Sequence, residues 1–119
     1  MIYDVIIIGS GPAGLAAGVY AQRARLSSII IEKEYMSGGQ ILNTYEVDNY
    51  PGLPGINGFD LGMKLREHCE GLGAEFVTAE VEKVSLAEDG QTKLVQTAEE
   101  TYQAKTVILA MGARHRLLE

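Results

Sequence analysis

The first 32 residues alternate between apolar runs and a glycine-rich turn. Residues 3–8 are an almost continuous apolar, β-branched run, which predicts a parallel strand covered on both faces. A helix is predicted over residues 12–25. Proline is favoured at the first position of a helix, because the N–H group that it lacks would have no partner inside the helix there. Residues 28–31 form a second β-branched run that Glu32 ends. Together these segments predict a βαβ unit.

The rest of the chain has a different pattern. Residues 33–57 show little periodicity and many turn residues, so we predict a long loop of the kind that is usually functional. An amphipathic helix is predicted over 58–72 and a short strand over 74–77. Weak alternation over 81–102, broken by two turns, predicts a three-stranded antiparallel meander, and 106–110 is the last predicted strand.

This order of elements predicts the α/β class. We expect a Rossmann-like, three-layer fold for binding a dinucleotide, with a parallel sheet and an antiparallel β-meander. At 119 residues the chain is long enough for one domain with a core and too short for two of ordinary size. Residues 1–119 are therefore expected to belong to a single domain.

Composition excludes some partners. The net charge of −6 argues against nucleic acid or an anionic membrane, because both favour basic patches. No apolar run approaches the roughly 20 residues that span a bilayer. The first residues lack the basic segment of a signal peptide, so a cytoplasmic setting is expected.

Cys69 is the only cysteine. The chain by itself therefore offers no disulfide, dithiol pair or thiolate metal cluster. Spacings of four, four and three place Cys69 on one helical face with three leucines, Leu61, Leu65 and Leu72. Because free cysteines are mostly buried, we expect Cys69 to lie in the core.

A glycine-rich motif follows the first strand. This candidate phosphate loop has the pattern G-x-G-x-x-G and consists of Gly9, Ser10, Gly11, Pro12, Ala13 and Gly14. Between a strand and a helix, with an acid 23 positions after its first glycine, the pattern predicts a dinucleotide site. We expect Gly9 to permit a tight turn, Gly11 to let a pyrophosphate approach the backbone, and Gly14 to allow close helix packing. Free N–H groups at the helix start would bind the pyrophosphate.

Glu32 is the acid that follows the motif. At the end of the second strand its carboxylate can accept hydrogen bonds from both hydroxyls of a ribose, and it would repel a 2′-phosphate. The site therefore suits FAD or NAD and disfavours NADP. The alternative is a glycine-rich turn of another α/β protein, with Glu32 merely solvated.

The long loop resembles the flavin-proximal loop of bacterial-type thioredoxin reductases. It contains Gly-Gly-Gln at 38–40 and Thr-Tyr-Glu-Val-Asp-Asn-Tyr-Pro-Gly at 44–52. The resemblance runs from Ile2 to Leu118 and includes the GSGPAGLAA start and the VILAMGA strand end. The start and the strand end are shared by many flavoproteins with two dinucleotide sites, whereas the loop is much more specific.

The resemblance implies FAD as the cofactor. The backbone of the candidate phosphate loop would hold the pyrophosphate, and Glu32 the adenosine ribose. Gln40 and Asn49 would bond near the flavin, unless they only shape the loop, and the backbone of Val81 would meet the adenine. The full set of expected cofactor-binding residues is Gly9, Ser10, Gly11, Pro12, Ala13, Gly14, Glu32, Lys33, Gly39, Gln40, Thr44, Asn49, Val81, Ala110 and Gly112. No catalytic residue and no metal ligand is expected in the chain.

One position departs from the family. The strand end there usually reads Ala-Thr-Gly, and here Met111 replaces the threonine. The lost hydroxyl removes a possible polar contact with the cofactor, worth about 1 kcal/mol, so Met111 is not expected to be a ligand. His115 is expected to be an exposed tail residue.

The implied reaction passes electrons from NADPH to FAD, then to a dithiol and a thioredoxin-like partner. The chain has no second glycine fingerprint and no Cys-x-x-C. We therefore expect the FAD-binding fragment of a parent enzyme, inactive alone, whose NADPH site lies elsewhere. An open edge of the last strand predicts a homodimer or other self-association. The alternatives are a free-standing dinucleotide-binding module without chemistry, or part of a related FAD-dependent ferredoxin or peroxiredoxin reductase.

Overall fold

A computed structural model describes residues 1–33 and 58–111 of the chain. Six strands form one mixed sheet in the order β3-β2-β1-β6-β5-β4. The first four in this order are parallel neighbours, and the last three are antiparallel neighbours. In chain order the elements are β1 (Ile2–Ile8), α1 (Pro12–Arg23), β2 (Ser28–Glu32), α2 (Gly58–Gly71), β3 (Glu75–Thr78), β4 (Val81–Leu86), β5 (Lys93–Thr97) and β6 (Thr101–Leu109). The predicted fold class is confirmed.

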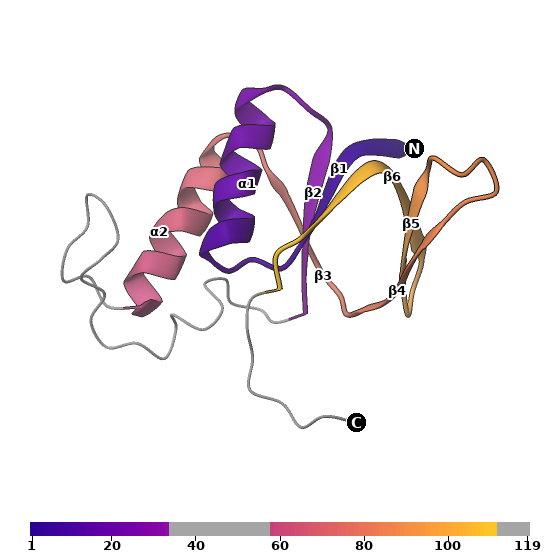
Figure 1. Ribbon diagram of the computed structural model, residues 1–119. Coiled ribbons are helices and arrows are strands. Elements are labelled where there is room, and N and C mark those ends of the chain that lie inside the picture. Colours follow the sequence, from indigo (N-terminus) through magenta and orange to yellow (C-terminus); the bar gives the residue numbers. More distant parts are fainter. Residues whose placement is uncertain (34–57, 112–119) are drawn as a thin grey trace.

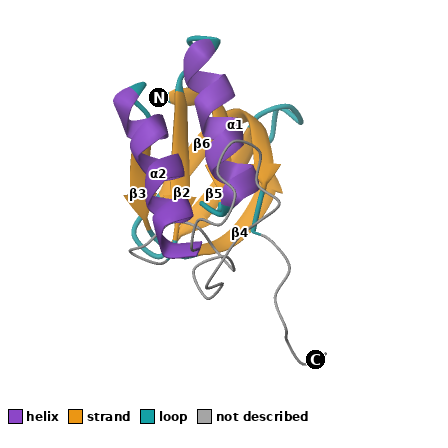
Figure 2. Cartoon of the chain, turned by 90° about the vertical axis from the view of Figure 1, so that its left-hand side faces the viewer, coloured by secondary structure: helices purple, strands orange, loops and turns teal. Residues whose placement is uncertain are grey.

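The elements form three layers. Helices α1 and α2 lie side by side on one face of the parallel strands, and β4 and β5 lie on the other side (Figures 1 and 2). Successive residues of β1 and β2 point to opposite faces of the sheet and belong to two apolar clusters. The first, against the helices, contains Val5, Ile7, Leu15, Ala21, Ile30 and Cys69. The second, against the meander, contains Ile6, Ile8, Ile29, Ile31, Val95 and Ala104. Both faces of β1 and β2 are therefore covered, as their continuous apolar runs predict.

Strand β6 corrects one prediction. The third meander strand and the last parallel strand are a single strand, because the residues between them, 103–105, include no turn former. Residues 101–104 pair antiparallel with β5, while β6 also runs parallel to β1 as far as the pair Ile8–Leu109. Among the described strands, none pairs with the second edge of β6 over residues 105–109.

Both helices end in the same way, earlier than predicted. Helix α1 ends at Arg23 because Arg25 adopts a left-handed conformation (φ 59°). The Arg25 N–H donates to the Gln22 carbonyl, and the N–H of the following residue donates to the Ala21 carbonyl. These two hydrogen bonds are the Schellman pattern. Helix α2 ends likewise before Gly73 (φ 94°). Leu72 therefore lies beyond the helix and is 40% exposed, so its predicted place on the buried face is wrong.

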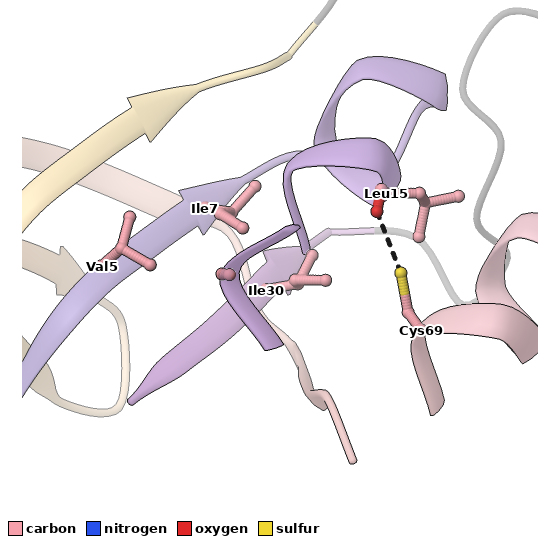
Figure 3. Close-up of a cluster of buried hydrophobic side chains, with 6 residues drawn as sticks. Val5, Ile7, Leu15, Ile30 and Cys69 are labelled. Carbon is pink, nitrogen blue, oxygen red and sulfur yellow. Dashed lines mark hydrogen bonds between the residues drawn. The ribbon is translucent and has the colours of Figure 1, made fainter. Parts of the chain in front are cut away.

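Cys69 lies in the core, as predicted. Its side chain is fully buried, and its thiol donates a hydrogen bond to the backbone carbonyl of Leu15, with Sγ 3.0 Å from the oxygen (Figure 3). Burial raises the pKa of the Cys69 thiol. A Cβ at Gly18 would lie 2.7 Å from Ile30 Cδ1 and 3.3 Å from the Cys69 sulfur, so this glycine allows α1 to pack closely on the sheet and on α2.

The turn between β4 and β5 is where the sequence predicts it. The Asp89 carboxylate accepts hydrogen bonds from the Thr92 hydroxyl and from the N–H groups of Gln91 and Thr92. These bonds lower the pKa of Asp89 to about 2. The Asp89 side chain thus stabilises the turn by accepting hydrogen bonds from backbone N–H groups two and three residues further on.

Candidate dinucleotide-binding site

The order of strands indicates where a ligand would bind. From β1 the sheet extends through β2 and β3 on one side, and the chain returns to β6 on the other side. Ligands of open α/β sheets bind outside the carboxyl ends of the strands at such a reversal. The candidate phosphate loop leaves β1 at this place. Topology and motif therefore indicate the same location independently.

Gly9 makes the tight turn that the sequence predicts. Its φ of 107° is one that residues with a side chain rarely adopt, and a Cβ would collide with the carbonyl oxygen of Ala110. The Gly9 N–H donates to the Ile31 carbonyl at 2.8 Å, and the Ala110 N–H donates to the Ile8 carbonyl at 2.8 Å. These two bonds hold the start of the loop between the ends of β2 and β6.

Gly14 brings the first turn of α1 directly onto the loop. A Cβ at this position would collide with the carbonyl oxygen of Gly9 and lie 3.4 Å from Ala110 Cβ. The close packing expected of this glycine is therefore confirmed. The neighbour is backbone, which cannot move aside as a flexible side chain can.

The start of helix α1 has the features of an anion site. Gly11 is the N-cap, Pro12 occupies the first helical position, and no side chain of the described residues caps the helix. The Leu15 N–H is the first to bond within the helix, to the Gly11 carbonyl at 2.9 Å. The N–H groups before it have no acceptor inside the helix, and the helix dipole favours an anion there.

Gly11 itself is in an ordinary extended conformation, with φ −72° and ψ −175°. Any residue adopts these angles, so the backbone conformation does not require glycine here. A residue without a side chain at this position would instead let a ligand approach the backbone. This is the reason for the second glycine of a dinucleotide fingerprint.

Glu32 is held against the loop by Ser10. The Ser10 N–H donates to Glu32 Oε1 at 2.8 Å, and the Ser10 hydroxyl donates to the same oxygen at 2.7 Å. Ser10 is fully buried and Glu32 is half-buried. The acid predicted to bind a ribose is therefore fixed beside the loop predicted to bind the pyrophosphate.

The corner between β3 and β4 reaches the same place. Glu32 pairs with Thr78 of β3, and its carbonyl accepts a hydrogen bond from the Ala79 N–H at 2.9 Å. Val81, two residues further on, begins β4, is half-buried and packs against the second apolar cluster. The structure thus brings the predicted adenine neighbour to the end of β2 where Glu32 lies.

The remaining predicted site residues divide into two groups. Ala110 is half-buried against the loop, whereas Lys33 is exposed and Met111 is 61% exposed. Predictions for the second group lie outside the described residues and remain predictions: Gly39, Gln40, Thr44, Asn49, Gly112 and His115.

Two features of the site are not evident in the sequence. Ser10 was expected only as part of the loop backbone, yet its side chain bonds to Glu32. Ala79 was not expected at the site, yet its N–H bonds to the Glu32 backbone. A serine between two glycines gives no signal for a partner 22 positions away. Only the register of β2 with its neighbours brings these residues together.

No group of three or more His, Cys, Asp or Glu side chains within residues 1–33 and 58–111 could hold a metal ion. Neither of the two described helices is long and apolar enough to cross a membrane.

The fold and the site define a class: an α/β domain of the Rossmann type, with a glycine-rich loop and a strand-end acid arranged for a dinucleotide. The family model described as pyridine nucleotide-disulphide oxidoreductase matches residues 3–119. The chain therefore belongs to this family of oxidoreductases.

Similar proteins carry more specific names. The thioredoxin reductase of Bacillus subtilis is 45% identical over 116 residues, which cover 97% of this chain and 35% of that protein. A solved thioredoxin reductase from Streptococcus pyogenes has a TM-score of 0.90 and 45% identity, over 98% of this chain and 37% of that one. A ferredoxin-flavin thioredoxin reductase from Clostridium acetobutylicum has a TM-score of 0.85 and 34% identity, over 98% and 39%. The chain thus spans about a third of the length of these relatives, and its predicted resemblance to thioredoxin reductases is confirmed.

Proposed function

We propose that the chain forms the FAD-binding part of a thioredoxin reductase-like oxidoreductase. One observation carries the proposal: the Glu32 carboxylate is bonded to Ser10, inside the loop that begins helix α1. A phosphate-binding element and a ribose-binding acid are thereby adjacent. Membership of the oxidoreductase family and the likeness to thioredoxin reductases support FAD as the dinucleotide.

The residues present fit the pyrophosphate end of FAD. Gly9 and Gly14 let the loop turn tightly and let the first turn of α1 pack onto it, because side chains there would collide with backbone. The N–H groups of Gly11, Ala13 and Gly14 lie at the start of α1 and would donate to the pyrophosphate. Pro12 has no N–H and instead fixes the backbone angle of the first helical residue.

The ribose and adenine would lie beyond the loop. Glu32 would accept hydrogen bonds from ribose hydroxyls and would repel a 2′-phosphate. Val81 at the start of β4 would meet the adenine, and Ala110 at the end of β6 would border the cofactor. Lys33, Gly39, Gln40, Thr44, Asn49 and Gly112 complete the proposed set of cofactor-binding residues.

When bound, FAD would supply the redox chemistry that links NADPH to a dithiol. The described residues contribute binding and orientation. We place the NADPH site and the dithiol outside these 119 residues, and we propose a thioredoxin-like protein as the partner of the parent enzyme, with homodimer formation and a cytoplasmic location. The segment alone would then be inactive.

Titration of the flavin-free, full-length protein with FAD tests the binding site. Glu32→Ala should weaken FAD binding by about 1–3 kcal/mol, the cost of removing a polar partner from a partly buried site. Asp4→Ala is the matched control, because Asp4 is an acid bonded to a serine at the opposite end of the same strands. Unchanged flavin occupancy in Glu32→Ala would contradict the assignment.

A second assay tests the reaction. The full-length protein should reduce a thioredoxin disulfide with NADPH, and absence of flavin and of turnover would favour a non-catalytic binding module. The likeness to a ferredoxin-flavin thioredoxin reductase supports one further candidate. In that case reduced ferredoxin, and not NADPH, would supply the electrons, so the two donors should be compared on the same sample.

A further inference from the structure

Ser10 occupies an unusual place in the candidate phosphate loop. It lies between Gly9, which has a positive φ, and Gly11, the N-cap of α1, and none of its surface is exposed. A loop residue that serves a ligand directly would present a donor to that ligand. The donors of Ser10 point elsewhere, because both bond to Glu32.

Ser10 has no hydrogen-bond donor left for the pyrophosphate. A serine hydroxyl has one proton, and its backbone has one N–H. Both are used by Glu32 Oε1, at 2.7 Å and 2.8 Å. A pyrophosphate only accepts hydrogen bonds, so Ser10 can offer it no donor while the contact with Glu32 persists. The pyrophosphate donors are then the N–H groups at Gly11 and beyond.

The contact instead restrains Glu32. A glutamate side chain has three rotatable bonds, and fixing an unrestrained glutamate on ligand binding costs conformational entropy. Two hydrogen bonds to one carboxylate oxygen, from a residue that is itself fully buried, fix that carboxylate before any ligand arrives. They also tie the ribose end of the site to the loop, so the spacing between the two is set in advance.

We propose, on the basis of the function proposed above, that Ser10 is a positioning residue for the adenosine ribose, acting through Glu32 rather than touching the cofactor. Serine suits this task because it combines a hydroxyl donor with a small volume. Threonine would place an extra methyl group in a fully buried position, where overpacking destabilises. Alanine would keep the N–H donor and lose the hydroxyl.

A double-mutant cycle on the flavin-free, full-length protein tests this inference. FAD affinity is measured for wild type, Ser10→Ala, Glu32→Gln and the double variant. Ser10→Ala should weaken FAD binding about tenfold, as expected for losing a hydrogen bond to a charged group. In the Glu32→Gln background the same change should have little further effect, because Ser10 acts through that carboxylate.

Ser28→Ala is the matched control. Ser28 is also a buried serine, at the opposite end of β2, and its hydroxyl bonds to Gln22 Oε1 at 3.3 Å. Its loss should lower the thermal stability of the flavin-free protein to a similar extent and leave FAD affinity unchanged. If Ser10→Ala does not fold, Ser10→Cys replaces it, since a thiol of similar size is a weaker donor and should give a smaller loss of affinity.

The outcomes separate this inference from the proposed function. If Glu32→Gln weakens FAD binding and Ser10→Ala does not, or if the two losses simply add, the positioning role is overturned and the site assignment stands. If Ser10→Ala lowers only stability, as Ser28→Ala should, Ser10 is merely structural. If wild type binds no FAD, or if Glu32→Gln has no effect, both proposals are wrong.

Discussion

The two ends of the parallel sheet carry similar contacts with different consequences. At the carboxyl end, Ser10 after β1 donates twice to Glu32 of β2. At the amino end, Asp4 of β1 accepts from the N–H of Ser27, just before β2, at 2.9 Å, and from its hydroxyl at 3.2 Å. Each pair joins the same two strands through one carboxylate and one serine.

The surroundings of the two pairs differ. Near the amino end, Lys105 Nζ lies 3.4 Å from the Asp4 carboxylate, and helix α1 ends in a Schellman motif that satisfies its own carbonyls. Near the carboxyl end, Gly9 and Gly14 pack the loop against neighbouring backbone, and α1 begins without a side-chain cap among the described residues. An acid–serine pair alone therefore only joins strands. In the proposed function, the Ser10–Glu32 pair also belongs to a binding site, because the N–H groups at the start of α1 lie beside it.

The largest expected effect of a single change concerns Gly11. Gly11→Val should abolish FAD binding while the fold persists, because the extended angles of Gly11 are open to valine and the added side chain obstructs the pyrophosphate. Flavin absorbance and circular dichroism on the same sample measure both. Full flavin content in this variant would contradict the proposal that the carboxyl end of the sheet binds the pyrophosphate.

Gly14→Ala should affect the fold as well as the site. The new Cβ would collide with the Gly9 backbone, and we expect a loss of about 1–3 kcal/mol in the free energy of unfolding, together with weaker FAD binding. Gly18→Ala is the control, since its Cβ would meet the end of the Ile30 side chain, which can move. Equal losses from both substitutions would show that the loop is not specially constrained.

The two ends of the sheet also differ along the edge of β6. Residues 101–104 pair with β5, whereas residues 105–109, which run toward the carboxyl end of the sheet, have one edge without a described partner strand. We expect the isolated 119 residues to self-associate through this edge. In light scattering, Ile108→Lys should remove most of this association.

Ile2→Lys is the control for that experiment. Ile2 is also an exposed apolar residue. Its replacement by lysine adds the same charge at the amino end of β1, a strand with neighbours on both sides. A monomeric wild-type segment, or equal effects of the two lysines, would contradict the predicted role of the edge.

The smallest expected effect concerns Asp4. The hydrogen bond from the Ser27 backbone, with further contributions from Lys105 and the Ser27 hydroxyl, lowers the pKa of Asp4 below its ordinary value. A carboxyl whose pKa is lower in the folded state stabilises the fold above its unfolded pKa, and this contribution is lost as the pH falls through the folded value. Asp4→Asn should therefore be modestly less stable than wild type at pH 7, and the difference should shrink below about pH 4.

Urea unfolding at pH 7 and at pH 3 measures this difference, and FAD titration of the same variant sharpens the comparison. FAD affinity should be unchanged, because the Asp4–Ser27 pair lies at the end of the sheet away from the loop. Weaker FAD binding in Asp4→Asn would show that the two ends are coupled.

The sequence by itself determined the local elements and indicated the candidate site. The βαβ unit, the glycine loop and the meander follow from periodicity and turn chemistry, which act between near neighbours in the chain. Glu32 could be identified because a strand end and a motif spacing are both visible in the sequence. The core position of Cys69 followed from its helical spacing in the same way.

The tertiary structure alone decided the contacts that depend on register. The continuity of β6, the exposure of Leu72 beyond helix α2 and the bond from Ala79 to Glu32 each depend on where one element meets another. The double bond from Ser10 to Glu32 is of the same kind. A residue's local pattern states which element it belongs to, but hydrogen bonds between distant residues require a defined strand pairing, and only the packed sheet provides it.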